Sequence, residues 1–106
     1  WREAPMNGPI SIIAVTGAAD GQETRVREAQ ERMVVETLSE PGCLRYELNQ
    51  SLDDPRVLFF TEMWASEDVW RAHMEGAAMQ RFQASGAGRL LSDFTLFRAK
   101  RVAGGA

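Results

Sequence analysis

Apolar residues occur along the chain in short blocks, and their periodicity changes at the end of each predicted element. Residues 10–16 (ISIIAVT) are β-branched and almost continuously apolar, which predicts a strand covered on both faces. Residues 22–39 instead carry apolar side chains at three- and four-residue spacing, which predicts an amphipathic helix with a charged, solvated face. We expect Asp20 and Glu23 to form a capping pair at the start of this helix.

The next blocks predict two strands joined by a turn. Residues 40–42 (EPG) end the helix, because proline cannot continue it and glycine favours a turn. Residues 43–50 alternate between apolar and polar, as a strand with one wetter face does. The expected apolar side of that strand is Leu44, Tyr46 and Leu48. After the turn signal at residues 53–55, both alternating sets of residues 57–64 are largely apolar, so both faces of this strand need a cover.

A second helix is predicted directly after the strand at residues 57–64. Ser66 is the predicted N-cap, because its hydroxyl can accept from the free N–H groups of the first turn. Glu67 and Asp68 place negative charge at the positive end of the helix dipole. The face expected to pack on the sheet carries Val69, Trp70, His73 and Met74.

Gly76 interrupts this helix, and residues 77–84 predict another short helical piece with Met79 and Phe82 inward. The glycine-rich stretch at residues 85–88 ends it. Residues 90–102 predict a last strand, whose apolar positions are Phe94, Leu96, Phe97 and Val102.

The predicted order is β-α-β-β-α-β, which indicates an α+β, ferredoxin-like fold with a four-stranded antiparallel sheet and two helices on one face. We expect a single domain over residues 10–102, with flexible tails at residues 1–9 and 103–106. The uncovered face of the sheet still carries apolar residues. A second copy of the same sheet is the simplest cover, so we expect a homodimer through that face.

Composition narrows the possible functions. A chain of 106 residues with 44% hydrophobic and 25% charged residues fits one globular domain. The net charge of -3 and the scattered cations argue against a nucleic-acid partner. The sequence has neither a long apolar run nor a signal-peptide pattern, so we expect no membrane partner and a cytoplasmic location. The single cysteine, Cys43, is interpreted as a small half-buried apolar residue.

Several short motifs resemble those of the antibiotic biosynthesis monooxygenase family, a group of dimeric α+β barrels that includes quinol monooxygenases and haem-degrading monooxygenases. The similar stretches are residues 40–43 (EPGC) before the second strand, residues 62–66 (EMWAS) at the end of the third, Ala72-His73, and Met79 with Phe82. The resemblance covers roughly residues 10–102. It implies the dimeric barrel fold and a small-ligand cavity in each chain.

The sequence also departs from particular branches of that family. Quinol-oxidising members often carry a second histidine where this chain has Ala78. Anthrone-type oxygenases have an asparagine and a tyrosine where this chain has Phe60 and Trp70. Haem-degrading members use an asparagine on the first strand, where the nearest residues here are Ile10 and Ser11.

The resemblance implies oxidation without a cofactor, in which an electron-rich phenol or quinol is deprotonated in an apolar pocket and reacts with molecular oxygen. The chain shows no glycine-rich nucleotide loop and no cluster of metal ligands, which agrees with that route. The predicted catalytic residues are His73 as base, Glu62 as a second candidate base and Trp64 as an indole donor. The predicted substrate-binding residues are Phe60, Trp70, Tyr46, Phe82 and Met79.

Other interpretations of the same residues stay open. Trp64, Trp70 and Phe82 are large aromatics that any small domain uses to build a core. His73 is equally consistent with a packing histidine, and Glu62 with an ion pair to Arg45 or Arg98. Two alternative functions follow: a haem-binding or haem-degrading protein with His73 as axial ligand, and a non-catalytic or isomerase-like barrel that binds a small apolar ligand.

Overall fold

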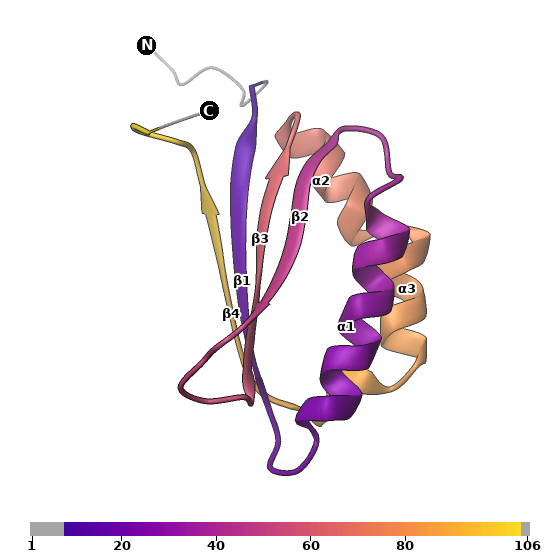
Figure 1. The fold of residues 1–106 in the computed structure, drawn as a ribbon. Coiled ribbons are helices and arrows are strands. Elements are labelled where there is room, and N and C mark those ends of the chain that lie inside the picture. Colours follow the sequence, from indigo (N-terminus) through magenta and orange to yellow (C-terminus); the bar gives the residue numbers. More distant parts are fainter. Residues whose placement is uncertain (1–7, 105–106) are drawn as a thin grey trace.

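The computed structural model describes residues 8–104 and has four strands and three α-helices in this part of the chain. The strands are β1 (Ile10–Ala18), β2 (Cys43–Gln50), β3 (Val57–Trp64) and β4 (Leu91–Ala99). The helices are α1 (Glu23–Thr37), α2 (Glu67–Met74), α3 (Ala77–Ala84) and a short 3₁₀ helix, η1 (Ala87–Leu90). The strands form one antiparallel sheet in the order β2-β3-β1-β4, with the helices on one face (Figure 1). The predicted ferredoxin-like α+β fold is confirmed.

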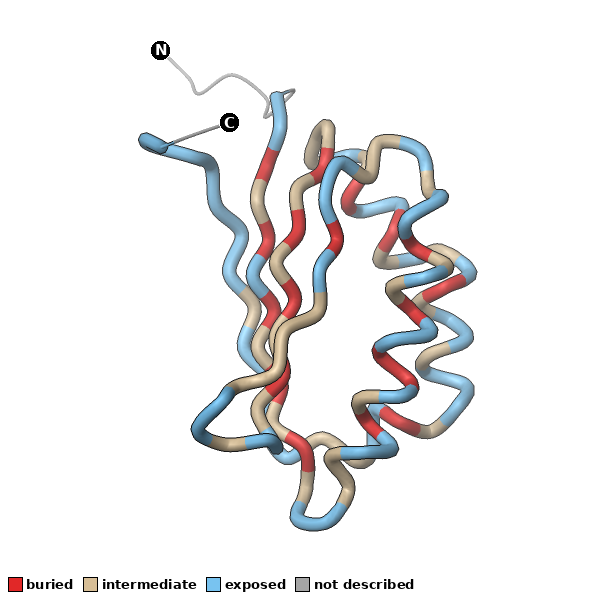
Figure 2. Tube along the Cα trace, in the orientation of Figure 1, coloured by how far each residue is buried: buried red, intermediate tan, exposed pale blue. Residues whose placement is uncertain are grey.

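The core lies between the sheet and the helices, and the alternation of the central strands produces it. Along β3 the buried residues are Leu58, Phe60, Glu62 and Trp64, and the residues between them are half-buried. The buried residues of β1 lie beside them, since Ile12 pairs with Glu62 and Ala14 with Phe60. Figure 2 shows this alternation of buried and half-buried residues along the central strands.

Helix α1 has the predicted apolar stripe, but its start differs from the prediction. Its N-cap is Gln22, which makes no side-chain capping bond. Asp20 instead pairs with Arg56, which also pairs with Asp54. The expected Asp20–Glu23 capping pair is therefore wrong, because a charged partner from the β2–β3 turn engages the Asp20 carboxylate.

Strand β2 contains an irregularity that alternation alone does not reveal. Cys43 pairs with Trp64 and Arg45 pairs with Met63, so Leu44 is an extra residue in a bulge. Leu44 is 57% exposed, and the prediction that it shares a side with Tyr46 is wrong. The half-buried Cys43 packs against the core instead.

The last strand is shorter than predicted. It begins at Leu91 after η1 and ends at Ala99, so Val102 lies outside it and is 92% exposed. The predicted N-terminal tail, residues 1–9, lies largely outside the described residues, as do the last two residues of the predicted tail at 103–106. Those two tails and the single-domain boundaries stay predictions.

The cap of α2 is confirmed. Ser66 is extended and its hydroxyl accepts from the backbone N–H of Val69 at 3.2 Å. Gly76 separates α2 from α3, as the sequence predicts.

Gly42 joins the turn after α1 to α2. Its φ of +78° lies in the left-handed region that favours glycine, and its carbonyl accepts from the backbone N–H of Ala65 at 2.9 Å. A Cβ at this position would lie 2.5 Å from Cγ1 of Val69. The turn therefore packs directly on α2, with no room for a side chain.

We expect Gly42→Ala to destabilise the fold more than Gly21→Ala, a matched change at φ +79° where a new Cβ meets no atom within 4 Å. Gly21→Ala should cost only the left-handed conformation, about 1–2 kcal/mol. Gly42→Ala should cost about 1–3 kcal/mol more, because the methyl group collides with Val69. Denaturant unfolding of both variants measures the difference. Equal losses of stability would contradict the predicted collision with Val69. Adding Val69→Ala should restore stability to Gly42→Ala but not to Gly21→Ala.

Candidate active site

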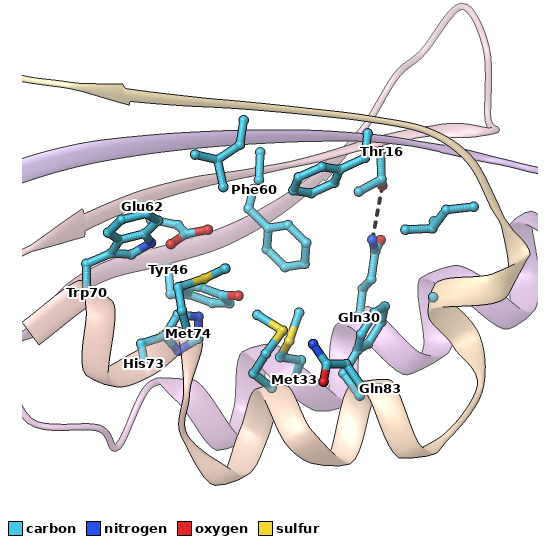
Figure 3. Close-up of a pocket in the computed structure, with 17 residues that line it drawn as sticks. Thr16, Gln30, Met33, Tyr46, Phe60, Glu62, Trp70, His73, Met74 and Gln83 are labelled. Carbon is cyan, nitrogen blue, oxygen red and sulfur yellow. Dashed lines mark hydrogen bonds between the residues drawn. The ribbon is translucent and has the colours of Figure 1, made fainter.

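A cavity of about 260 Å³ lies between the sheet and the helices. Its lining is mostly apolar, as small-molecule sites generally are. Seven of the eight predicted site residues line it: Tyr46, Phe60, Glu62, Trp70, His73, Met79 and Phe82. Figure 3 labels the first five of these. The seven side chains come from β2, β3, α2 and α3, so the fold brings together residues that are up to 36 positions apart in the sequence, counting from 46 to 82.

Trp64 is the predicted site residue that the structure places elsewhere. Its side chain is fully buried and does not belong to the cavity lining. Its indole Nε1–H donates to Oε1 of Glu62 at 2.8 Å. The Trp64 N–H is therefore engaged by Glu62 and is not free to hold an oxyanion.

Glu62 is a buried carboxyl group at one end of the cavity. Burial raises its pKa to about 7, and the hydrogen bond from Trp64 opposes only part of that rise. The expected ion pair with Arg45 or Arg98 is wrong, since Arg45 lies beside Glu47 and Arg98 pairs with Glu67. Within residues 8–104 the Trp64 indole is the one hydrogen-bond partner of the Glu62 carboxyl group. Glu62 can therefore exchange a proton with a ligand near neutral pH.

His73 lies at the same end, held by two rings and one carboxylate. Its ring stacks on Trp64 with centroids 4.6 Å apart and meets the edge of Tyr46 at 5.4 Å. Its Nδ1 lies 2.9 Å from Oε1 of Glu40. Sequence patterns do not indicate Glu40 as a site residue, because it lies 33 residues before His73, in a proline-glycine turn that is typical of a helix end.

Tyr46 completes this polar end. Its ring packs against Phe60 with centroids 5.2 Å apart. Burial and the nearby Glu62 carboxylate raise the pKa of Tyr46 far above its ordinary range. The phenol therefore keeps its proton and is available as a hydrogen-bond donor.

The far end of the cavity carries a second polar group, which is not among the residues predicted from the sequence. The Thr16 hydroxyl donates to the Leu58 carbonyl at 3.0 Å and accepts from Nε2 of Gln30 at 3.0 Å (Figure 3). Gln30 is 1% exposed, and its Oε1 has no hydrogen-bond partner among the described residues. A glutamine inside the apolar stripe of α1 was the available signal.

The two polar ends are separated along the strand direction. Glu62 pairs across the sheet with Ile12, and Thr16 lies four residues further along β1, so the two ends are roughly 13 Å apart. Ala14 and Phe60 line the space between them. Gln83 and Phe94 line the cavity and are themselves exposed, so the cavity opens between α3 and β4.

The surroundings of Cys43 keep its thiol protonated. Burial and the charges of Glu40 and Glu62 raise the pKa of Cys43, so its thiol stays protonated. No group of three or more His, Cys, Asp or Glu side chains in residues 8–104 is placed to hold a metal ion. Over the same residues, no helix is long and apolar enough to cross a membrane.

Comparison with known proteins identifies what this arrangement resembles. The family model for antibiotic biosynthesis monooxygenase matches residues 9–85. No curated protein matches the chain. Among solved structures, PA3566 from Pseudomonas aeruginosa is 26% identical with a TM-score of 0.84, and the match covers 94% of this chain and 100% of that one. SO0527 from Shewanella oneidensis is 26% identical with a TM-score of 0.80, over 87% and 89% of the two chains.

Rv0793 from Mycobacterium tuberculosis is 21% identical with a TM-score of 0.84, over 93% of this chain and 100% of that one. At this identity the likeness extends to the fold alone.

The buried carboxyl group of Glu62 makes stability depend on pH. An acid whose pKa rises on folding, here from 4.5 to about 7, binds its proton more tightly in the folded state. The free energy of unfolding therefore falls as the pH rises from 4.5 through 7. Glu62→Gln cannot ionise and keeps an acceptor for Trp64. Between acid and mildly alkaline pH, the free energy of unfolding of Glu62→Gln should therefore rise by up to about 3 kcal/mol relative to that of the wild type.

Denaturant unfolding at a series of pH values measures this gain. Glu31→Gln, a change in an exposed carboxylate of α1, is the matched control and should show no such trend. A constant difference between Glu62→Gln and the wild type across the pH range would contradict the raised pKa.

Proposed function

This chain belongs to the antibiotic biosynthesis monooxygenase family, and we propose that it is a cofactor-independent monooxygenase that oxidises a small phenolic, quinol-type or other aromatic substrate with molecular oxygen. One observation carries the proposal: a proton acceptor with a pKa of about 7 lies at the end of an apolar cavity. An electron-rich aromatic hydroxyl compound fits such a site, because its ring suits the apolar walls and its hydroxyl needs a base.

Each lining residue has a role in this proposal. Glu62 accepts the hydroxyl proton, and Trp64 orients the Glu62 carboxyl through their 2.8 Å hydrogen bond. His73 and the Tyr46 phenol lie at the same end. The phenol can donate to the developing oxyanion, and the imidazole can accept a hydrogen bond from the substrate hydroxyl. The rings that hold the substrate are Phe60, Trp70 and Phe82, with Met79 beside them.

The proposed reaction draws all its electrons from the substrate. Loss of the hydroxyl proton to Glu62 gives an anion whose charge reaches a ring carbon that carries hydrogen. That carbon forms a bond to one atom of O₂ and gives a hydroperoxide. Cleavage of the O–O bond, with loss of the hydrogen on the same carbon, leaves a carbonyl group and releases water. One oxygen atom enters the product, the other becomes water, and the proton held by Glu62 is returned.

We also propose that two copies of the chain form a homodimer through the face of the sheet that no helix covers. Ile13 pairs with Thr61 on one side and with Phe97 on the other, so these three side chains share the face that no helix covers. Ile13 is 41% exposed and Phe97 is 55% exposed. Half-buried Val15 and Phe59 continue the apolar surface along the strands. A second copy of this sheet would remove that surface from water.

Oxygen uptake with a panel of dihydroquinones and anthrones tests the reaction. Glu62→Gln should lower kcat by about 10²–10⁴ on any compound that the wild type oxidises, because it removes the base. The wild-type rate should rise with pH through about 7 as Glu62 ionises. Glu31→Gln should keep wild-type uptake. Saturable binding of these compounds without any oxygen uptake would instead indicate a small-ligand-binding protein.

Light scattering tests the dimer. The wild type should give twice the chain mass of 11.8 kDa. Phe97→Lys places a charge on the proposed interface and should shift the mass toward the monomer. Leu52→Lys, at a fully exposed position in the β2–β3 turn, should leave the mass unchanged. A wild-type monomer at micromolar concentration would exclude this assembly.

A further inference from the structure

Glu40 and His73 form the one carboxylate–imidazole contact in residues 8–104. The Oε1 of Glu40 lies 2.9 Å from Nδ1 of His73. The His73 side chain is 1% exposed, whereas that of Glu40 is 22% exposed. The imidazole lines the cavity and Glu40 does not. Glu40 can therefore influence a bound molecule only through His73.

Two separate sets of contacts hold this pair together. The imidazole is fixed by its stack on Trp64 and by the edge of Tyr46. Glu40 is fixed by the turn after α1, where its N–H donates to the Thr37 carbonyl at 2.9 Å. The close packing of Gly42 on Val69 ties that turn to the helix that carries His73. The hydrogen bond is thus built into the fold.

This hydrogen bond decides which ring nitrogen of His73 carries the proton. A carboxylate can only accept, so neutral His73 must donate from Nδ1–H and keep its lone pair on Nε2. The other titratable groups near the ring are Glu62 on β3 and Tyr46 and Cys43 on β2. Tyr46 and Cys43 keep their protons, because burial raises the pKa of each. Within the described residues, Glu40 is the carboxylate bonded to the ring.

We propose that Glu40 is a positioning residue that holds His73 in the Nδ1-protonated tautomer, so that Nε2 is the ring nitrogen able to accept a hydrogen bond or proton from a hydroxyl-bearing ligand. When Nε2 accepts a proton, the imidazolium forms beside a negative charge that stabilises it, the logic by which carboxylates orient and support histidine bases. The expected effect of Glu40 on the reaction rate rests on the proposed oxidation, whereas its effect on the tautomer of His73 does not.

The chain contains one histidine, so ¹⁵N NMR of histidine-labelled protein reports His73 without assignment. In the neutral wild-type ring, Nδ1 should resonate as a protonated nitrogen and Nε2 as an unprotonated one. Glu40→Ala should shift the population toward the Nε2-protonated tautomer. Glu36→Ala, which removes a carboxylate paired with Arg81 near the same end of α1, is the matched control and should change neither signal. An Nε2-protonated wild type, or a Glu40→Ala spectrum like the wild type, would overturn the proposal.

Kinetics separates this inference from the proposed function. On a compound that the wild type oxidises, Glu40→Ala and Glu40→Gln should each lower kcat about 10–100-fold with little change in KM, as loss of a residue that orients a histidine does. If the tautomer responds to Glu40→Ala but the wild type consumes no oxygen, the positioning role stands and the oxidation is wrong. If uptake is normal in the wild type and in both variants, the oxidation stands and the role of Glu40 is wrong.

Discussion

The indole ring of Trp64 determines the geometry of the polar end of the cavity. One edge of the ring donates to Glu62 at 2.8 Å, and one face stacks on His73 at 4.6 Å. Both candidate proton acceptors are therefore held against a single rigid, fully buried side chain at the end of β3. Rigid placement by residues behind a site is what keeps reactive groups within the narrow geometry that catalysis needs. Trp64 supports the site without contacting the cavity.

Two carboxyl groups flank the Trp64–His73 pair, and their surroundings differ. Glu62 lies in the apolar cavity and its pKa is raised to about 7, whereas Glu40 reaches solvent and contacts the imidazole at Nδ1. Two carboxyl groups in such different surroundings commonly have different roles in acid–base chemistry. Here the buried carboxyl group can exchange a proton with a ligand, and the solvent-accessible one can orient the histidine.

Sequence patterns predicted the fold closely because its main elements depend on local signals. The bounds of β2, β3 and α3 and the Ser66 cap follow from alternation, turn residues and a hydroxyl at the helix start. What the sequence could not supply depended on distant partners. Leu44 does not lie on its predicted side of β2, because the pairing with β3 places it in a bulge. Asp20 does not cap α1, because it pairs with Arg56 from another turn. Glu40 joins the site only through the packing of its turn on α2.

The positions of the costly polar groups favour a binding site over ordinary core packing. The Oε1 of Gln30 is buried without a partner, which typically costs about 1–3 kcal/mol, and the ionised form of Glu62 is penalised by burial. Both side chains line the same cavity, one at each end. Apolar residues at these two positions would give a more stable core, whereas the proposed ligand would offset the cost of the polar ones by supplying hydrogen bonds. A planar aromatic with a polar group at one or both ends matches that pattern, because the walls between Glu62 and Gln30 offer it only apolar contact.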